Sequence, residues 1–429
     1  MTPVLQRPNI TVSNLECSSN NWNWRAERTE PAHRSPRRSC EEKVPVIIDF
    51  DTHILPKDSF DYMDARFEQL KPNLVFDDKG ICRRIDFPGD APRVPGATPL
   101  PGPGTGATYP GMCDVDNRIE VMDQLGIDRQ VLVPQFQGFW SYLIDRPLAI
   151  SMARSYNISI KNIVDRHPDR FIGGALIPLQ DVEASVAELE WARDAGFKVI
   201  ILDKVFPVTE HCFSVPLGSR RELWPFFQRV QELGMTTLLH SVTHGHRTTN
   251  LMVYQMDGLD IFATPEGHIS MMSLVTSGLL DEIPDLKFVF TEAGTSFLEP
   301  LLKRFDTAFE SPPVDYDAED AATVFNMRRL TSGKRLVPFD VYKAKNKERP
   351  SDYFRRNFLF TIEPEEPGFA ESVKFLGASQ FLFATDYPHD DPGGRMKMKD
   401  VELLHAEPGL TADEKDMLFG RNALGLIAH

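Results

Sequence analysis

The feature that most limits the fold of this chain is a series of eight short apolar runs separated by amphipathic segments. Such nearly continuous apolar runs are typical of parallel strands that are covered on both faces. The segments between them include residues 182–196 and 221–234, which both end in glycine, a common signal for the end of a helix. The alternation predicts an α/β fold, a (β/α)8 TIM barrel. The predicted strands are residues 46–51, 129–134, 171–179, 197–203, 236–240, 286–292, 357–363 and 381–386.

Three segments depart from this alternation. Residues 1–44 are polar apart from an NNWNW stretch, and we interpret them as an irregular N-terminal extension; an arm that packs on a neighbouring subunit is the alternative. Residues 45–429 then form one barrel domain. The loop insertion 88–111 is dense in proline and glycine, which favours either a lid or pocket wall, or a plain surface loop. The charged insertion 307–352 has no predicted role.

The charge and cysteine content restrict the partners and the compartment of this chain. Its net charge of −15 argues against nucleic acid or an anionic membrane surface as a partner. No apolar run approaches the roughly 20 residues that cross a bilayer, and the first residues do not resemble a secretory signal. The five cysteines contain no CxxC pair, which excludes a zinc ribbon and argues against a disulfide scaffold. We therefore expect a cytoplasmic protein that acts on a small molecule.

The residue types that bind metal most readily lie at the ends of predicted strands. Asp51 and His53 close the first strand and His240 closes the fifth. Glu292 closes the sixth strand and Asp386 the eighth. The carboxyl ends of all strands surround one mouth of a barrel, and charged groups are costly there unless they are paired or bound to an ion. The pattern therefore predicts a divalent metal centre.

Each of these residues also has a simpler interpretation. Asp51 and His53 alternate on a strand and can reach one ion, but alone they could be a turn cap and a surface histidine. His240 could be a core histidine bonded to a backbone carbonyl. Asp386 can bind metal and also accept a proton, which makes it the predicted catalytic residue. His389, three residues further on, is predicted to be a ligand or to support one.

Two loops next to the predicted strands contain candidate substrate contacts. His244 and Arg247 follow the fifth strand, and Arg247 could bind a substrate carboxylate or remain a solvated loop charge. Trp140 belongs to an aromatic group that follows the second strand and could line a pocket, although packing under a loop is the plainer interpretation. The other aromatic residues of this group are Phe136, Phe139 and Tyr142.

Three motifs carry a resemblance to a known family. The segments DFDTHILPKDSF at 49–60, SGLLDEIPDLKFVFTEAGTSFLEPLLKRFD at 277–306 and FLFATDYPHDD at 381–391 resemble the amidohydrolase-related branch of the amidohydrolase superfamily. That branch includes the aminocarboxymuconate semialdehyde decarboxylase type and the resorcylate-type decarboxylases. The resemblance spans roughly residues 46–428, and a helix at 116–127 also fits it. These motifs indicate the family and not one activity.

The resemblance implies a metal held by a first-strand pair, a fifth-strand histidine and an eighth-strand aspartate. These functions fall on Asp51, His53, His240 and Asp386. Two positions depart from the decarboxylase type. Asp51 stands where the pair is commonly HxH or ExH, and Glu292 stands where those enzymes have a histidine. The added carboxylates suit iron or manganese at least as well as zinc, and Glu292 could bridge two ions.

Three functions remain open from the sequence. The first is metal-dependent hydrolysis or non-oxidative decarboxylation of a small carboxylate-bearing substrate. The second is a dinuclear non-haem iron or iron–manganese monooxygenase, which would need an external electron donor of the ferredoxin type. The third is a partner subunit of a hetero-oligomeric enzyme. One or two divalent ions (zinc, iron or manganese) are expected, in a homo- or hetero-oligomer.

Overall fold

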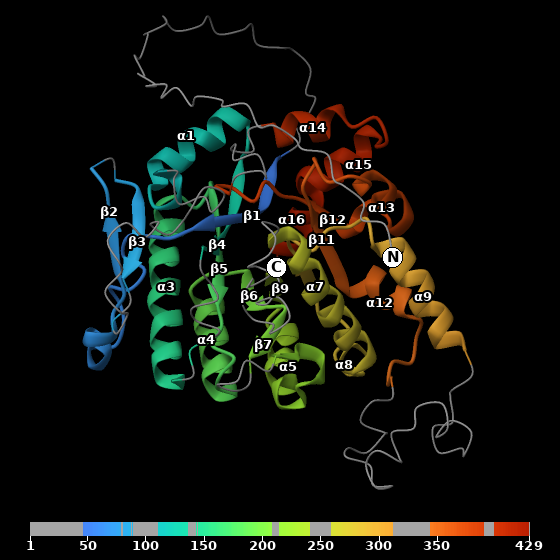
Figure 1. The fold of residues 1–429 in the computed structure, drawn as a ribbon, viewed down its shortest axis with the longest axis horizontal. Helices are drawn as coiled ribbons and strands as arrows, with labels where there is room; N and C mark the ends of the chain where they lie inside the picture. The colour runs from blue at the N-terminus through green and yellow to red at the C-terminus, as the bar shows by residue number, and fades with distance from the viewer. Residues whose placement is uncertain are drawn as a thin grey trace, which may run out of the picture. The chain divides into compact units, whose positions relative to one another are not determined.

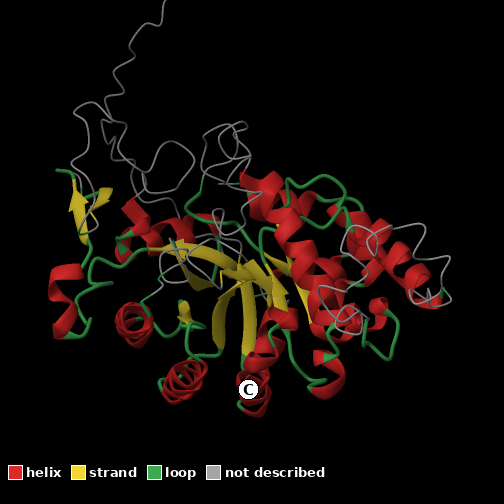
Figure 2. Cartoon of the chain, turned by 60° about the horizontal axis from the view of Figure 1, so that its bottom comes forward, coloured by secondary structure: helices red, strands yellow, loops and turns green. Residues whose placement is uncertain are grey.

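The described part of the chain contains eight parallel strands in one sheet. The computed structural model describes residues 46–78, 80–86, 88, 110–135, 143, 145–207, 214–240, 259–311, 344–389 and 399–428. Helices surround the strands, which lie in the middle of the fold (Figures 1 and 2). In spatial order the strands are β1 (Ile48–Ile54), β4 (Arg129–Pro134), β5 (Phe171–Leu176), β6 (Val199–Asp203), β9 (Thr236–His240), β10 (Phe288–Phe290), β11 (Phe358–Ile362) and β12 (Phe381–Phe383).

The chain after β12 closes this sheet against β1. Thr52 and Tyr387 form a parallel bridge between the two segments. The Asp386 amide donates to the Asp51 carbonyl at 3.1 Å, and the His53 amide donates to the Tyr387 carbonyl at 2.6 Å. The sheet is therefore a nearly closed barrel. The predicted (β/α)8 TIM barrel is confirmed, and each predicted apolar run overlaps one strand.

The helices follow the strands and cover the outside of the barrel (Figure 2). Helix α1 begins and ends at residues suited to the role: Asp114 accepts a hydrogen bond from the Asn117 amide at its start, and Gly126 ends it at φ 72°. The α-helices are α1 (Val115–Leu125), α3 (Arg146–Arg166), α4 (Val182–Asp194), α5 (Trp224–Glu232), α7 (Leu259–Thr276), α8 (Leu279–Glu282), α9 (Leu298–Glu310), α12 (Pro350–Asn357), α13 (Phe369–Leu376), α14 (Asp400–Ala406), α15 (Ala412–Asp416) and α16 (Asn422–Ile427).

Short turns and two hairpins complete the described structure. The hairpins β2 (Asn73–Phe76) with β3 (Cys82–Asp86), and β7 (Val205–Pro207) with β8 (Ser214–Pro216), are antiparallel and were not predicted. The turns are η1 (Ala65–Leu70), η2 (Pro110–Met112), η3 (Leu217–Ser219), η4 (Arg221–Leu223), η6 (Ala378–Gln380) and η7 (Met417–Arg421, a π-helical turn). None of the described helices is long and apolar enough to cross a membrane.

The core of the barrel is apolar and rich in phenylalanine. Phe288 and Phe290 of β10 contact Phe358 edge to face, with ring centroids 6.1 and 5.1 Å apart, and Phe290 also stacks on Phe360. Such aromatic contacts add to the stability that burial itself provides. The core therefore holds the strands rigidly, and the positions just beyond the strand ends are left for polar side chains.

Several predictions concern residues outside the described ranges. These are the extension 1–44 and most of the insertion 88–111. The predicted boundaries of the insertion 307–352 are wrong, because helix α9 continues to Glu310 and helix α12 begins at Pro350. Its central part, 312–343, also lies outside the described ranges.

Candidate metal centre

Six side chains that could bind a metal meet at the C-terminal end of the strands. β1 supplies two of them and β9 supplies one; the others lie within six residues after β10 and β12. The arrangement brings together every residue that the sequence predicted as a ligand. They form two overlapping groups, in each of which the ligand atoms all lie within 4.8 Å of one another. The first group is Asp51, His53, His240 and Glu292, and the second is His53, Glu292, Asp386 and His389.

The first group surrounds the Nε2 atom of His240. This atom lies 3.2 Å from Oε1 of Glu292, 3.2 Å from Nε2 of His53 and 3.9 Å from Oδ2 of Asp51. Asp51, His53 and His240 are buried, and Glu292 is partly buried. Asp51 and His53 come from alternate positions of β1, so their side chains point to the same side of the strand, as predicted.

The second group surrounds the carboxylate of Asp386. Its Oδ1 atom lies 3.0 Å from Nε2 of His53 and 2.8 Å from Nδ1 of His389. Nε2 of His53 is also 3.5 Å from Oε1 of Glu292. His53 and Glu292 thus belong to both groups, and Glu292 is the carboxylate placed between them.

Glu292 and Asp386, the two carboxylates that follow β10 and β12, have a left-handed backbone conformation. Glu292 has φ 46° and Asp386 has φ 57°, and within the described ranges they are the non-glycine residues with positive φ. Such a conformation costs on the order of 1–3 kcal/mol and is concentrated at functional sites. Both residues lie within three positions of the end of a strand, Glu292 after β10 and Asp386 after β12.

Burial and charge oppose each other in this cluster. Burial raises the pKa of Asp51, and the neighbouring His240 and His53 offset this only in part. Oδ1 of Asp51 is buried without a hydrogen-bond partner. A buried carboxylate oxygen without a donor is costly unless a cation lies beside it. The residues therefore fit a divalent cation, for which carboxylate and imidazole are suitable ligands.

The pKa values of Asp386 and His53 also fit a site for a divalent cation. Burial would raise the pKa of Asp386, but His389 and the hydrogen bond from His53 lower it to about 2. Burial would lower the pKa of His53, but hydrogen bonds to Asp386 and Glu292 raise it well above its ordinary value. The raised pKa values of His53 and His240 favour protons on these two rings, which offset the charge of the carboxylates; a bound cation would replace those protons.

The sequence did not identify the polar residues that support these side chains. Arg118 of α1 is fully buried, and it donates to the Gly111 carbonyl at 3.0 Å and to Oε1 of Gln130 at 3.0 Å. It also donates to the backbone carbonyl of His53. Gln135, which follows β4, contacts His389. An arginine in an amphipathic helix and a glutamine after a strand carry no signal that separates them from surface residues.

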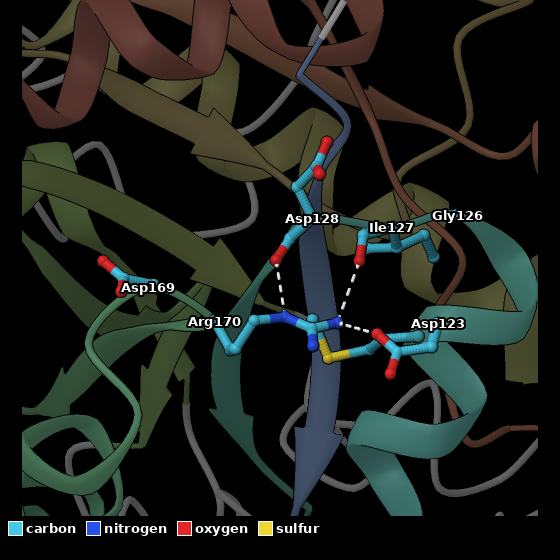
Figure 3. A pocket seen from close by; sticks show the side chains of 7 residues that line it. Asp123, Gly126, Ile127, Asp128, Asp169 and Arg170 are labelled. Carbon is cyan, nitrogen blue, oxygen red and sulfur yellow. Dashed lines mark hydrogen bonds and ion pairs between the residues drawn. The ribbon is translucent and has the colours of Figure 1, made fainter. Parts of the chain in front are cut away.

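A hollow of about 370 Å³ lies at the other end of the strands (Figure 3). Arg170 crosses it and donates to the carbonyls of Asp128 at 3.0 Å and Ile127 at 3.3 Å, and it pairs with Asp123 at 2.8 Å. These residues precede β4 and β5, whereas the metal-binding residues lie at or beyond the C-terminal ends of their strands. This hollow therefore lies at the N-terminal end of the strands, where the residues of a barrel contribute to stability and not to catalysis.

The predicted substrate contacts lie outside the described residues. His244, Arg247 and Trp140 are among them, as are Phe136, Phe139 and Tyr142. Their assignment stays a prediction.

Comparison with known proteins identifies relatives of this chain. A sequence profile described as amidohydrolase matches residues 48–427. The chain is 24% identical over 326 residues to a 2-amino-3-carboxymuconate-6-semialdehyde decarboxylase of Dictyostelium discoideum, covering 73% of this chain and 76% of that protein. It is 25% identical over 289 residues to a gamma-resorcylate decarboxylase of Polaromonas, covering 64% and 77%.

A solved structure shares the fold. It is a dihydroxybenzoic acid decarboxylase of Polaromonas with bound manganese and the inhibitor 2-nitroresorcinol. The TM-score is 0.62 at 20% identity, and the match covers 90% of this chain and 97% of that one. At this identity the likeness supports the barrel.

Proposed function

Because this chain belongs to the amidohydrolase family and is a metal-dependent hydrolase or decarboxylase, we propose that it removes CO2 non-oxidatively from a small aromatic or conjugated carboxylate. The observation that carries the proposal is the convergence of carboxylate and imidazole ligands at one barrel mouth. Both curated relatives named above are decarboxylases. The related manganese-containing structure favours manganese as the ion.

The residues divide this work between holding a cation and moving a proton. Asp51, His53, His240 and Asp386 would hold the ion, which when bound polarises substrate oxygens. Glu292 lies 3.2 Å from His240, and its pKa is lowered well below its ordinary value: His240 and His53 outweigh the opposing effect of burial. Its carboxylate is therefore ionised and available to the same ion.

Asp386 is the residue that we assign to proton transfer. Its carboxylate is ionised in the folded protein, which is the form that can accept a proton from a substrate hydroxyl or a bound water. When the C–CO2 bond breaks, its electron pair stays on the ring or chain carbon. Return of the proton to that carbon completes the reaction. Nδ1 of His389 lies 2.8 Å from Oδ1, so this histidine is also among the residues that would hold the ion.

The test is to load the protein with Mn²⁺ and to measure CO2 release from a panel of hydroxybenzoates and unsaturated dicarboxylates. Variants His240→Ala and Asp386→Ala are each expected to lower bound metal and to abolish turnover. Full metal occupancy in both variants would show that the ligand assignment is wrong. A metal-loaded wild-type protein that released no CO2 from any compound of the panel would exclude the decarboxylase proposal.

A second function, the two-ion oxygenase, depends on whether two ions can bind. The six residues form two groups that share both Glu292, which can bridge two ions, and His53, of which Nε2 can bind only one. None of the relatives named above is an oxygenase, so this function rests on the ligand set alone. Two iron or manganese ions per chain, with oxygen consumption that depends on a ferredoxin-type reductant, would support it. One ion per chain would exclude it.

A further inference from the structure

The end of strand β4 lies beside the metal centre but supplies none of the ligands. Pro134 is the last residue of β4, and Gln135 follows it. The Gln135 amide donates to the Ile54 carbonyl at 3.1 Å, so its backbone is held by β1 next to His53. The side chain of Gln135 is therefore presented from a fixed point on the rim of the barrel.

Gln135 contacts the outer nitrogen of the His389 ring. Both ends of the Gln135 amide reach Nε2 of His389, Oε1 at 3.0 Å and Nε2 at 2.9 Å, while Nδ1 of the same ring lies 2.8 Å from Oδ1 of Asp386. A His389 ring that binds an ion through Nδ1 carries its hydrogen on Nε2, and the amide assigned with Oε1 toward the ring accepts that hydrogen. The ring atom that faces Asp386 and the cation is then Nδ1.

The end of β4 also contacts the ring of His53. Nδ1 of His53 lies 3.4 Å from the Pro134 carbonyl oxygen, which leaves Nε2 to face Asp386, Glu292 and His240. The rings of His53 and His389 stack with centroids 4.2 Å apart and planes at 21°. Two consecutive residues of one strand end thus hold the outer nitrogens of two stacked imidazoles.

We propose that Gln135 is a positioning residue of the metal centre, which orients His389 so that Nδ1 is the atom presented to the ion. The proposal rests on the proposed function in so far as His389 is a ligand. Hydrogen bonds to the outer nitrogen of a ligating histidine fix its orientation, and their loss weakens metal binding about 10- to 100-fold. Gln135 is therefore expected to affect the affinity for the ion without touching it.

The experiment measures the dissociation constants of Mn²⁺ and Co²⁺ by chelator competition, together with the visible absorption of the Co²⁺ form. Gln135→Leu and Gln135→Met remove the acceptor at similar size, and both are expected to bind about 10- to 100-fold more weakly with an altered Co²⁺ spectrum. Gln135→Glu keeps an acceptor and is expected to bind within a few-fold of wild type. Gln228→Leu, an exposed glutamine of α5, is the matched control.

The outcomes separate this inference from the proposed function. Wild-type affinity and an unchanged Co²⁺ spectrum in Gln135→Leu or Gln135→Met would overturn the role of Gln135 and leave the metal centre standing. If Gln135→Glu binds the ion as weakly as the Leu variant, the side chain of Gln135 contributes only packing, and its positioning role is also overturned. A wild-type protein that binds neither ion would overturn the proposed function itself. Circular dichroism of each metal-free variant shows that it is folded.

Discussion

At the scale of single residues, the ligands of the proposed centre contribute to metal-free stability with opposite signs. The surroundings of Glu292 and Asp386 lower the pKa of each carboxyl despite its burial, so ionisation of these groups favours the folded state. Burial raises the pKa of Asp51, so ionisation of this group opposes folding. The negative charge of Asp51 therefore favours binding of the ion but lowers the stability of the metal-free protein.

The substitution Asp51→Asn tests this conflict. Near neutral pH the carboxyl is ionised in the unfolded chain, and a raised pKa means that the folded chain disfavours that charge. The metal-free variant is expected to gain about 1 kcal/mol in the free energy of unfolding at pH 7 while losing metal affinity. Urea denaturation in the presence of a chelator measures the free energy of unfolding, and chelator competition measures the metal affinity. A less stable metal-free variant would contradict the prediction.

At the scale of elements, the closure between β1 and the chain after β12 holds the ligands of both segments in register. Asp49 of β1 accepts hydrogen bonds from the amide of Thr385 at 3.0 Å and from its hydroxyl at 2.7 Å. The same hydroxyl accepts a hydrogen bond from the Tyr387 amide at 3.1 Å. Thr385 directly precedes Asp386, and Asp49 lies two residues before Asp51, so this junction sets the distance between two ligands.

The substitution Thr385→Val removes the hydroxyl from this closure. Two buried hydrogen bonds are lost, and a typical net contribution of about 1 kcal/mol each predicts a loss of about 2 kcal/mol in the free energy of unfolding. We also expect weaker metal binding, because Asp386 loses its support. Thr385→Ser keeps the hydroxyl and is the control. Equal urea stability of the Val and Ser variants would show that the hydroxyl is not what closes the barrel.

At the scale of the whole barrel, the two ends of the strands have separate roles. The metal-binding residues occupy the C-terminal end, and the Arg170 contacts of Figure 3 occupy the N-terminal end. Binding to the folded state alone stabilises a protein by about 2.7 kcal/mol when the ligand stands at 100 times its dissociation constant. The stability of this protein should therefore depend on the ion at one end only.

Removal of the ion by a chelator is expected to lower the melting temperature, and re-addition of Mn²⁺ to restore it. The control is Arg170→Ala, which loses hydrogen bonds at the opposite end and should cost about 1 kcal/mol. This variant is expected to show the same difference between its metal-loaded and metal-free forms as wild type. Differential scanning calorimetry measures the melting temperatures of the metal-loaded and metal-free forms of both proteins. A smaller difference in Arg170→Ala would show that the two ends are coupled.

The residue order was enough to predict the barrel and all six residues of the candidate metal centre. A parallel strand covered on both faces must be apolar along its whole length, and this requirement is visible in the residue order. For the same reason a polar residue at the end of such a run, such as His240 or Asp386, stands out as a candidate ligand. Strand ends were less certain: β1 runs to Ile54, so His53 lies inside it.

How these residues are combined became visible only in the folded chain. The division into two groups that share His53 and Glu292, and the positive φ of Glu292 and Asp386, depend on the exact ends of strands. The contact of Gln135 with His389 joins residues 254 positions apart. A glutamine after a strand looks like any loop residue in the sequence, because its role comes from the fold bringing a distant partner within 3.0 Å.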